Sequence, residues 1–426
     1  MIKKNLNNLF LFNGMKLAKL IYALVVTVAL VRFLGPADYG LYSYILIITS
    51  FISIVSTFGM RSIIVKLAVG GEYSVTSLLN HSILIYIILF TISYLVLILS
   101  IIITKQSFEI SVYFLIVGFA NFFLMYEIFV TYFEIEKKYK IYTNIKILSM
   151  IFSSIIIFGL IIFHSPIIFV FSAYLAEALL MFLLVLRYLP KGTFHFKMEQ
   201  INKKILKNLI KMSAPLMFSS VAVLIYMKID QIMLFNILGS EATGLYTVGV
   251  RIIEQAYVIP LSLSVVLFPD LLNTEKLDDE VTNKEFQKLL QLVIVFSLIC
   301  ILTIYFFGQL GLRYLFGETY LIIFPALLIL SVNVLPVGFG LICTKWFIMN
   351  GLQGRLLFFT VVGCVVNVVL NSILISALGV TGAALASLIA QLFTAIIINA
   401  FFMNTRRLFR IQMRSFSVRR WKINVL

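Results

Sequence analysis

The amino-acid sequence predicts an all-α integral membrane protein of about twelve transmembrane helices in two parallel six-helix bundles. Of its 426 residues, 62% are hydrophobic and only 12% are charged, whereas soluble domains are about half apolar and about a quarter charged. Apolar runs of roughly 20 residues, each long enough to cross about 30 Å of hydrocarbon, follow one another along the chain. A nine-residue motif also recurs near the middle of the chain. These observations exclude an ordinary soluble domain.

The predicted spans follow one another through the whole chain. They cover residues 15–33, 39–60, 79–103, 110–133, 141–163, 166–189, 213–237, 246–271, 288–307, 320–342, 356–377 and 380–403. The first run is too long for the apolar core of a signal peptide, and it carries Lys16 and Lys19. We therefore expect it to remain as a transmembrane helix.

The recurring motif indicates a duplicated chain. Residues 34–42 read LGPADYGLY and residues 238–246 read LGSEATGLY, at a constant offset of 204 residues. Each copy follows the first span of a six-span half, so both halves enter the membrane from the same side and form a parallel repeat. Parallel repeats usually enclose a central cavity and alternate its access by rocking one bundle against the other. The repeat therefore points to a transporter, although a fold does not define a substrate.

Four regions follow from this division. We expect an N-terminal bundle over residues 1–189, a cytoplasmic amphipathic connector over 190–212, a C-terminal bundle over 213–403 and a basic cytoplasmic tail over 404–426. In the connector, apolar residues recur at helical spacing opposite several lysines, as in a helix that lies on a membrane surface. Connector and tail could contact anionic membrane lipids or simply anchor the topology.

The distribution of basic residues predicts the orientation. The 34 Lys and Arg residues outnumber the 18 Asp and Glu residues, a net charge of +16, and almost all of them fall on one side of the predicted membrane. Only Arg32, Lys105 and Arg313 fall on the other side. The positive-inside rule then places both termini in the cytoplasm. Because these charges line membrane borders, lipid headgroups explain them, and we expect no nucleic-acid partner.

The sequence indicates neither catalysis nor a cofactor. Three cysteines lack CxxC spacing, and the three histidines are scattered without a metal-binding or nucleophile motif. The predicted outer loops are short, so a membrane-bound sugar polymerase would have no room there for acidic catalytic groups. We expect no catalytic residues, no metal and no cofactor.

Charged residues inside the predicted seventh and eighth spans are candidates for function, because such residues are costly in a bilayer. Arg251 and Glu254 share a helix face, and Asp230 lies at comparable depth on the preceding span. We expect Asp230 to pair with Arg251 in a cluster that includes Tyr226 and Glu254, which would turn Lys228 toward a cavity. The alternative is that these charges only hold two helices together.

Two further acids lie within predicted spans of the first half. Glu127 in the fourth span and Glu177 in the sixth have no charged neighbour in the local sequence. Either could carry a proton or Na⁺, or could form a hydrogen bond to a neighbouring helix.

The repeated segments resemble a known family. The stretches LVRFLGPADYGLY (Leu30 to Tyr42) and IDQIMLFNILGSEATGLYTVGVRIIE (Ile229 to Glu254) resemble the polysaccharide transporter family. Its best-known members are the Wzx-type O-antigen flippases of the multidrug, oligosaccharidyl-lipid and polysaccharide exporter superfamily. The resemblance implies a MATE-like exporter fold and a role in lipopolysaccharide or capsule biosynthesis. The implied flippase moves an undecaprenyl-diphosphate-linked repeat unit to the outer leaflet of a bacterial inner membrane.

The resemblance also implies a basic cavity for the diphosphate and the sugar. Lys228 and Arg251 fit that expectation, with Arg61, Lys19 and Lys66 as first contacts at the cytoplasmic mouth. Other polysaccharide assembly proteins could be partners. Lipid II flippases of the superfamily carry two additional helices, for which this chain has no room. A drug or cation antiporter of the same superfamily is the main alternative, and it would need an acidic cavity.

Overall fold

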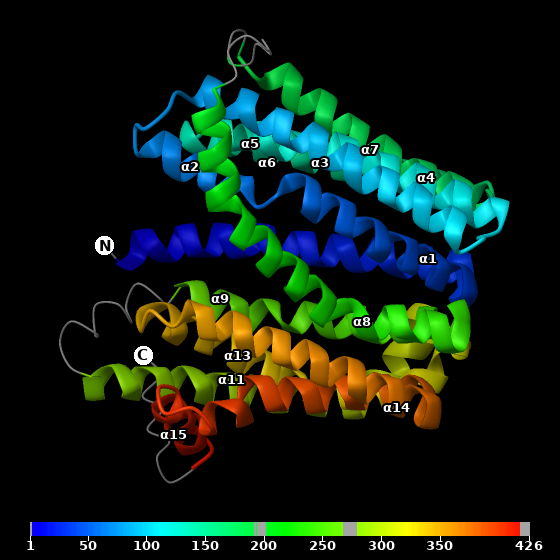
Figure 1. Cartoon of the computed structure of the whole chain (residues 1–426). Coiled ribbons are helices and arrows are strands. Elements are labelled where there is room, and N and C mark those ends of the chain that lie inside the picture. The colour runs from blue at the N-terminus through cyan, green and yellow to red at the C-terminus, as the bar shows by residue number, and fades with distance from the viewer. Residues whose placement is uncertain (1, 191–192, 194–201, 267–278, 418–426) are drawn as a thin grey trace. The chain divides into compact units, whose positions relative to one another are not determined.

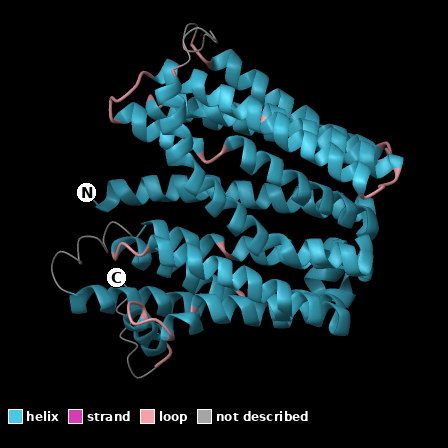
Figure 2. Ribbon diagram, viewed as in Figure 1, coloured by secondary structure: helices cyan, strands magenta, loops and turns pink. Residues whose placement is uncertain are grey.

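The part of the chain that the computed structural model describes consists of helices joined by loops and turns, with no strand in those residues (Figure 2). The structure describes residues 2–190, 193, 202–266 and 279–417, with side chains for residues 22–265 and 280–417 within these ranges. The helices of the first part are α1 (Ile2–Thr57), α2 (Met60–Val69), α3 (Val75–Ile103), α4 (Phe108–Phe123), α5 (Tyr126–Ile135), α6 (Tyr139–Ile162) and α7 (Ile167–Tyr188) (Figure 1). The later helices are α8 (Lys203–Ala256), α9 (Val258–Val266), α11 (Asp279–Gly311), η2 (Leu312–Phe316), η3 (Glu318–Ile323), α12 (Phe324–Val332), α13 (Val334–Met349), α14 (Gln353–Ala395), η4 (Ile397–Ala400) and α15 (Arg406–Ser415).

These helices make the chain a multi-pass membrane protein. Nine helical segments among the described residues are long and apolar enough to cross a bilayer. Three of them, Tyr22–Val69, Lys203–Val265 and Gln353–Ala400, each overlap two of the spans that the sequence predicts. The predicted count of twelve helices and their division into two six-helix bundles stay predictions.

A glycine with non-helical backbone interrupts each of these three long helices. Gly35 in α1 has φ 71° and ψ 176°, and Gly239 in α8 has φ 88° and ψ −175°. This region of backbone space is essentially restricted to glycine. The two glycines occupy equivalent places in the repeated motif, so the repeat in sequence is also a repeat in local conformation. Gly379 in α14 is the third interruption, with φ 61°.

Contacts across Gly239 show that α8 turns back on itself. Tyr246 donates a hydrogen bond to Asp230 over 2.5 Å, and Thr247 donates to Gln231 over 3.2 Å. Further from the glycine, Lys228 meets Glu254. Residues farther before Gly239 in the sequence contact residues farther after it, so the two halves of α8 run antiparallel.

The chain divides into two compact units. Unit 1 comprises residues 1–41 and 225–426, and unit 2 comprises residues 42–224. Unit 2 is built on α7, which packs against α4 and α6. The core of unit 1 lies among α11, α13, α14 and α15, where Phe286, Phe339 and Trp346 are buried. The four regions predicted from the sequence stay predictions.

The described parts of the predicted connector and tail are amphipathic helices. At the start of α8, Ile205 and Leu209 are buried while the neighbouring lysines are exposed. In α15, Leu408 and Ile411 are buried beside exposed arginines. Contact of these helices with membrane lipids stays a prediction. Residues 191–192, 194–201 and 418–426 lie outside the described residues.

The two copies of the repeated motif contact each other inside unit 1. A Cβ atom added at Gly40 would overlap the carbonyl oxygen of Ser240, and one added at Gly244 would overlap that of Pro36. Pro36 and Ser240 are themselves equivalent positions of the repeat. The contact is therefore reciprocal, and it explains why both copies keep this glycine: the two backbones lie too close for any side chain.

Gly244→Ala is expected to destabilise unit 1, because its methyl group has only a backbone carbonyl to displace. Overpacking of this kind typically costs about 1 to 3 kcal/mol. Gly311→Ala is the matched control, since nothing lies within 4 Å of a Cβ at that position. Thermal unfolding of detergent-solubilised protein, followed by size-exclusion chromatography, measures both. Equal stability of the two variants would contradict the backbone contact.

Candidate functional site

A group of three charged residues lies across the α8 hairpin, and we call it the α8 charge cluster: Lys228, Arg251 and Glu254. The Nζ atom of Lys228 lies 2.7 Å from Oε1 of Glu254, and Nη1 of Arg251 lies 3.4 Å from Oε2. The Lys228 side chain is 17% exposed and that of Arg251 is 43% exposed. Two cations thus share the carboxylate of Glu254, and the guanidinium is the more exposed of the two.

The predicted membership of this cluster is wrong for two residues. Asp230 accepts hydrogen bonds from Tyr246, from Ser387 over 3.3 Å and from the backbone N–H of Gln231, and Tyr226 is hydrogen-bonded to Thr394 over 2.7 Å. Lys228, which was predicted to face a cavity, instead forms an ion pair with Glu254. Residues 228 and 230 lie about 200° apart around a helix. Only the packing of the hairpin determines which of the two faces turns toward Glu254.

Asp230 instead belongs to a buried set of polar side chains that we call the Asp230 network. Ser387 links Asp230 to Asn367, which lies 3.5 Å from the serine oxygen, and Asn371 donates to Asn367 over 2.9 Å. The Oδ1 atom of Asn371 is buried with no hydrogen-bond partner among the described residues. Oxygen-rich sites of this kind suit a proton or a hard cation. Ion coupling at Asp230 stays a prediction.

The sequence reasoning missed Asn367, Asn371 and Ser387. A signal was present, because Asn367 and Asn371 are four residues apart in an otherwise apolar run and so share a helix face. No group of three or more His, Cys, Asp or Glu side chains that could hold a metal occurs among the described residues.

Unit 2 contains a separate cavity of about 620 Å³, lined by apolar side chains together with charged and hydroxyl groups. It lies beside two broken helices: α1 ends at Thr57 before α2 begins at Met60, and α4 ends at Phe123 before α5 begins at Tyr126. Broken helices in membrane proteins are tolerated where they line a cavity or are buried in protein. The lining residues are Thr57, Gly59, Met60, Arg61, Ser62, Val65, Glu127, Ile128, Glu134, Leu216, Ser219 and Ser220. We call this cavity the unit 2 pocket.

Arg61 is the centre of an ion-pair triad in the unit 2 pocket. Its guanidinium contacts both oxygens of Glu134, at 2.5 Å and 3.3 Å, and Nη1 lies 3.3 Å from Oε2 of Glu127. One cation between two carboxylates gives a local charge of −1. The expectation that Arg61 adds positive charge to a binding site is therefore not met in this pocket, and Glu127 is not an isolated acid. These partners are 66 and 73 residues from Arg61 in sequence, beyond the reach of local patterns.

The remaining predicted residues are dispersed. Glu177 on α7 accepts a hydrogen bond from Ser153 on α6 over 2.7 Å, in agreement with the predicted alternative of a bond to a neighbouring helix. Lys66 is exposed on α2, and no contact to the triad is found for it. The side chain of Lys19 lies outside the described side chains.

Comparison with solved structures defines the class of fold. The chain is similar to the lipid II flippase MurJ in an inward closed conformation, with a TM-score of 0.72, 17% identity and coverage of 95% of this chain and 90% of that one. It is similar to an inward-facing multidrug resistance MATE family transporter of the MOP superfamily, with a TM-score of 0.71, 16% identity and coverage of 93% and 96%. The third is a MOP superfamily transporter from Pyrococcus furiosus whose binding pocket has reversed polarity, with a TM-score of 0.57, 18% identity and coverage of 94% and 93%. At such identities the likeness establishes the fold alone.

The family follows from the sequence match. The family described as polysaccharide biosynthesis protein matches residues 6–275, and the chain belongs to that family. A curated relative, uncharacterized membrane protein MJ1375 of Methanocaldococcus jannaschii, is 26% identical over 218 residues. The match covers 47% of this chain and 49% of that relative.

The α8 charge cluster predicts a specific pattern of stabilities. Glu254→Gln removes the shared anion from two cations and should cost about 1.5 to 3 kcal/mol, the range for hydrogen bonds to charged groups. The double variant Lys228→Met with Glu254→Gln should recover part of that loss, because it removes the buried ammonium group together with the carboxylate that it contacts. A double-mutant cycle of thermal stability measures the coupling. Additive losses would show that the Lys228 contact contributes nothing.

Proposed function

We propose that the protein is a flippase that moves a lipid-linked oligosaccharide carrying a diphosphate across the membrane. The family supports a place in polysaccharide biosynthesis. The observation that carries the proposal is the α8 charge cluster, in which Lys228 and Arg251 share the single carboxylate of Glu254. The net positive charge and the accessible guanidinium suit an oxyanion, since Arg binds phosphate oxygens in a forked geometry.

In its finer form the proposal follows the sequence analysis. The cargo is an undecaprenyl-diphosphate-linked repeat unit of O-antigen or capsule, moved by alternating access from the cytoplasmic to the outer leaflet of a bacterial inner membrane. Both termini are cytoplasmic, and other polysaccharide assembly proteins receive the cargo. The polyprenyl chain stays in lipid, so only the headgroup needs a polar path.

The membrane potential alone is large enough to drive this step. Each negative charge that moves outward across an inside-negative membrane gains about 2.3 kcal/mol per 100 mV. A diphosphate diester carries about two charges, which gives about 4.6 kcal/mol, or more than three decades of bias. Coupling to a proton or Na⁺ at the Asp230 network is therefore not required.

Deletion of the gene tests the proposed function. The deleted strain should lose its surface polysaccharide and accumulate lipid-linked repeat units on the inner leaflet. Extracted lipids analysed by mass spectrometry, with a membrane-impermeant label to assign the leaflet, measure this. Unchanged polysaccharide in a clean deletion would refute the proposal.

Substitutions of Arg251 and Lys228 should lower export in the complemented strain. Arg251→Ala and Lys228→Ala should each lower export at least about tenfold at normal protein level, because each removes a cation worth roughly 1.4 kcal/mol or more to the bound headgroup. Lys228→Arg keeps the charge and should retain most export. Lys284→Ala, which removes a 66% exposed lysine of unit 1, is the control. Full activity of both alanine variants would show that the α8 charge cluster is not part of the substrate site.

One observation favours a second candidate, a drug or cation antiporter. The unit 2 pocket carries a local charge of −1 around Arg61, which suits a cation better than a diphosphate. Expression of the chain in a sensitive host distinguishes the two candidates. A gain of resistance to cationic dyes, with surface polysaccharide unaffected by deletion, would support the antiporter.

A further inference from the structure

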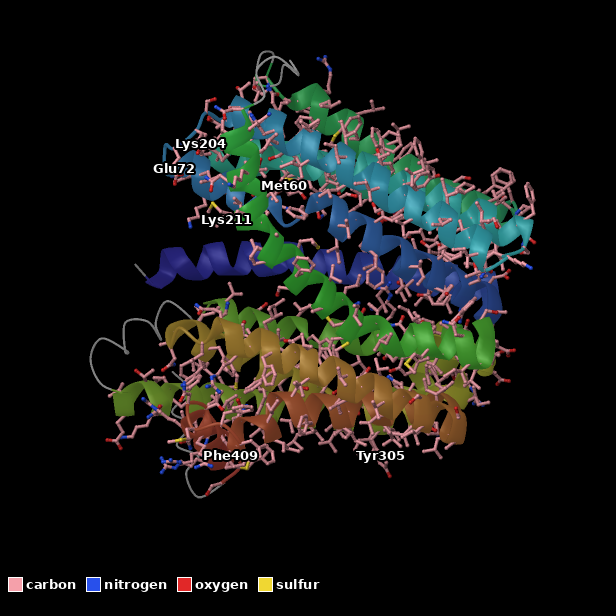
Figure 3. The ribbon with its side chains drawn as sticks, in the orientation of Figure 1. Met60, Glu72, Lys204, Lys211, Tyr305 and Phe409 are labelled. Atoms are coloured by element: carbon pink, nitrogen blue, oxygen red, sulfur yellow. The ribbon has the colours of Figure 1, made fainter. Side chains whose placement is uncertain are left out.

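The unit 2 pocket differs in its chemistry from the α8 charge cluster. All of its lining residues belong to unit 2, from the end of α1, from α2 and α5, and from the part of α8 near Lys211. Figure 3 shows Met60, which lines the pocket, at the same end of unit 2 as Lys204, Lys211 and Glu72. The volume of about 620 Å³ lies within the range of small-molecule sites.

The two carboxylates of the triad receive different numbers of hydrogen bonds from Arg61. Glu134 receives two hydrogen bonds from Arg61, whereas Glu127 receives one at 3.3 Å. The Oε1 atom of Glu127 has no hydrogen-bond partner among the described residues. The Glu127 side chain is 38% exposed and lines the cavity. Glu127 is therefore the carboxylate that retains capacity for a ligand.

The remaining polar lining offers both donors and acceptors. Ser62 and Ser220 donate to the carbonyl oxygens of Gly59 and Leu216, over 3.5 Å and 2.9 Å, so their oxygens can still accept, and Ser219 adds a third hydroxyl. A saccharide hydroxyl can accept from the guanidinium while it donates to a carboxylate or a serine oxygen. A purely apolar ligand would displace water from these groups without replacing its hydrogen bonds, which is costly.

The charge of the pocket then selects among polar ligands. A local charge of −1 repels a diphosphate or an acidic sugar, so this pocket is not a second diphosphate site. A positively charged amino group would instead restore neutrality and use the free Oε1 of Glu127. Hydroxyls together with an ammonium group are the chemistry of an amino sugar whose amine is not acylated.

We propose that the unit 2 pocket binds an amine-bearing saccharide, with the ammonium group on Glu127 and the ring hydroxyls on Arg61 and the serines. The inference rests on the proposed function, because it assigns this sugar to the glycan part of the translocated lipid.

The full chain in lipid nanodiscs tests the inference, with three soluble probes: glucosamine, N-acetylglucosamine and inorganic pyrophosphate. The two sugars share a ring and differ in the charge of the amine. Equilibrium dialysis should show glucosamine binding at least about tenfold more tightly than N-acetylglucosamine, a difference of about 1.4 kcal/mol. Pyrophosphate at equal concentration should not displace glucosamine from the pocket.

Two variants assign the effect to the pocket. Glu127→Gln should lower glucosamine affinity to that of N-acetylglucosamine, while Glu72→Gln, the same charge change on an exposed residue outside the lining, should leave it unchanged. Ser219→Leu leaves the triad intact, removes one hydroxyl and narrows the cavity, so it should lower the affinity for both sugars at least about tenfold. This variant keeps the test decisive if Glu127→Gln fails to fold.

Several outcomes would overturn the inference: equal affinity for the two sugars, displacement of glucosamine by pyrophosphate, or full glucosamine binding in Ser219→Leu. Its failure is distinguishable from failure of the proposed function. If deletion abolishes surface polysaccharide but glucosamine does not bind, the inference fails and the flippase stands. If glucosamine binds but deletion leaves the polysaccharide unchanged, the flippase fails and the assignment of this sugar to its cargo fails with it.

Discussion

The antiparallel return of α8 at Gly239 is the constraint on which the rest of unit 1 depends. Only glycine adopts the backbone conformation found there without strain, and it aligns Lys228 with Glu254 and Asp230 with Tyr246. The equivalent turn at Gly35 carries Gly40 into reciprocal backbone contact with Gly244. The charged cluster therefore lies on a hairpin whose geometry is set by backbone, not by the charges themselves.

The two polar regions have opposite charge, and each follows from the number of ionisable groups that share a contact. In unit 1 two cations meet one carboxylate, whereas in unit 2 one guanidinium meets two carboxylates. Partial burial makes such imbalances matter, because the surrounding dielectric is lower than that of water. An anionic diphosphate suits the first region and a cationic ligand suits the second, which an antiporter would also use.

Much of the fold could be predicted because its signals are local. Apolar runs of bilayer length predict spans, and the repeated motif indicated that two segments of the chain are related. The site was less predictable. The expected Asp230–Arg251 pair assumed the wrong helix face, and Arg61 found partners 66 and 73 residues away. Asn367 and Asn371 offered a helical spacing that could have been used.

By itself, the sequence determined that this chain lies in a membrane, that a motif of its first half recurs in its second, and that costly charges remain within apolar segments, because composition and periodicity reflect solvent and backbone directly. Only the tertiary structure decided how those charges pair. Two charged groups pair only when they lie within a few ångströms of each other on neighbouring helices. A shift of one residue along a helix turns the side chain by about 100° around the helix axis and so changes its partner.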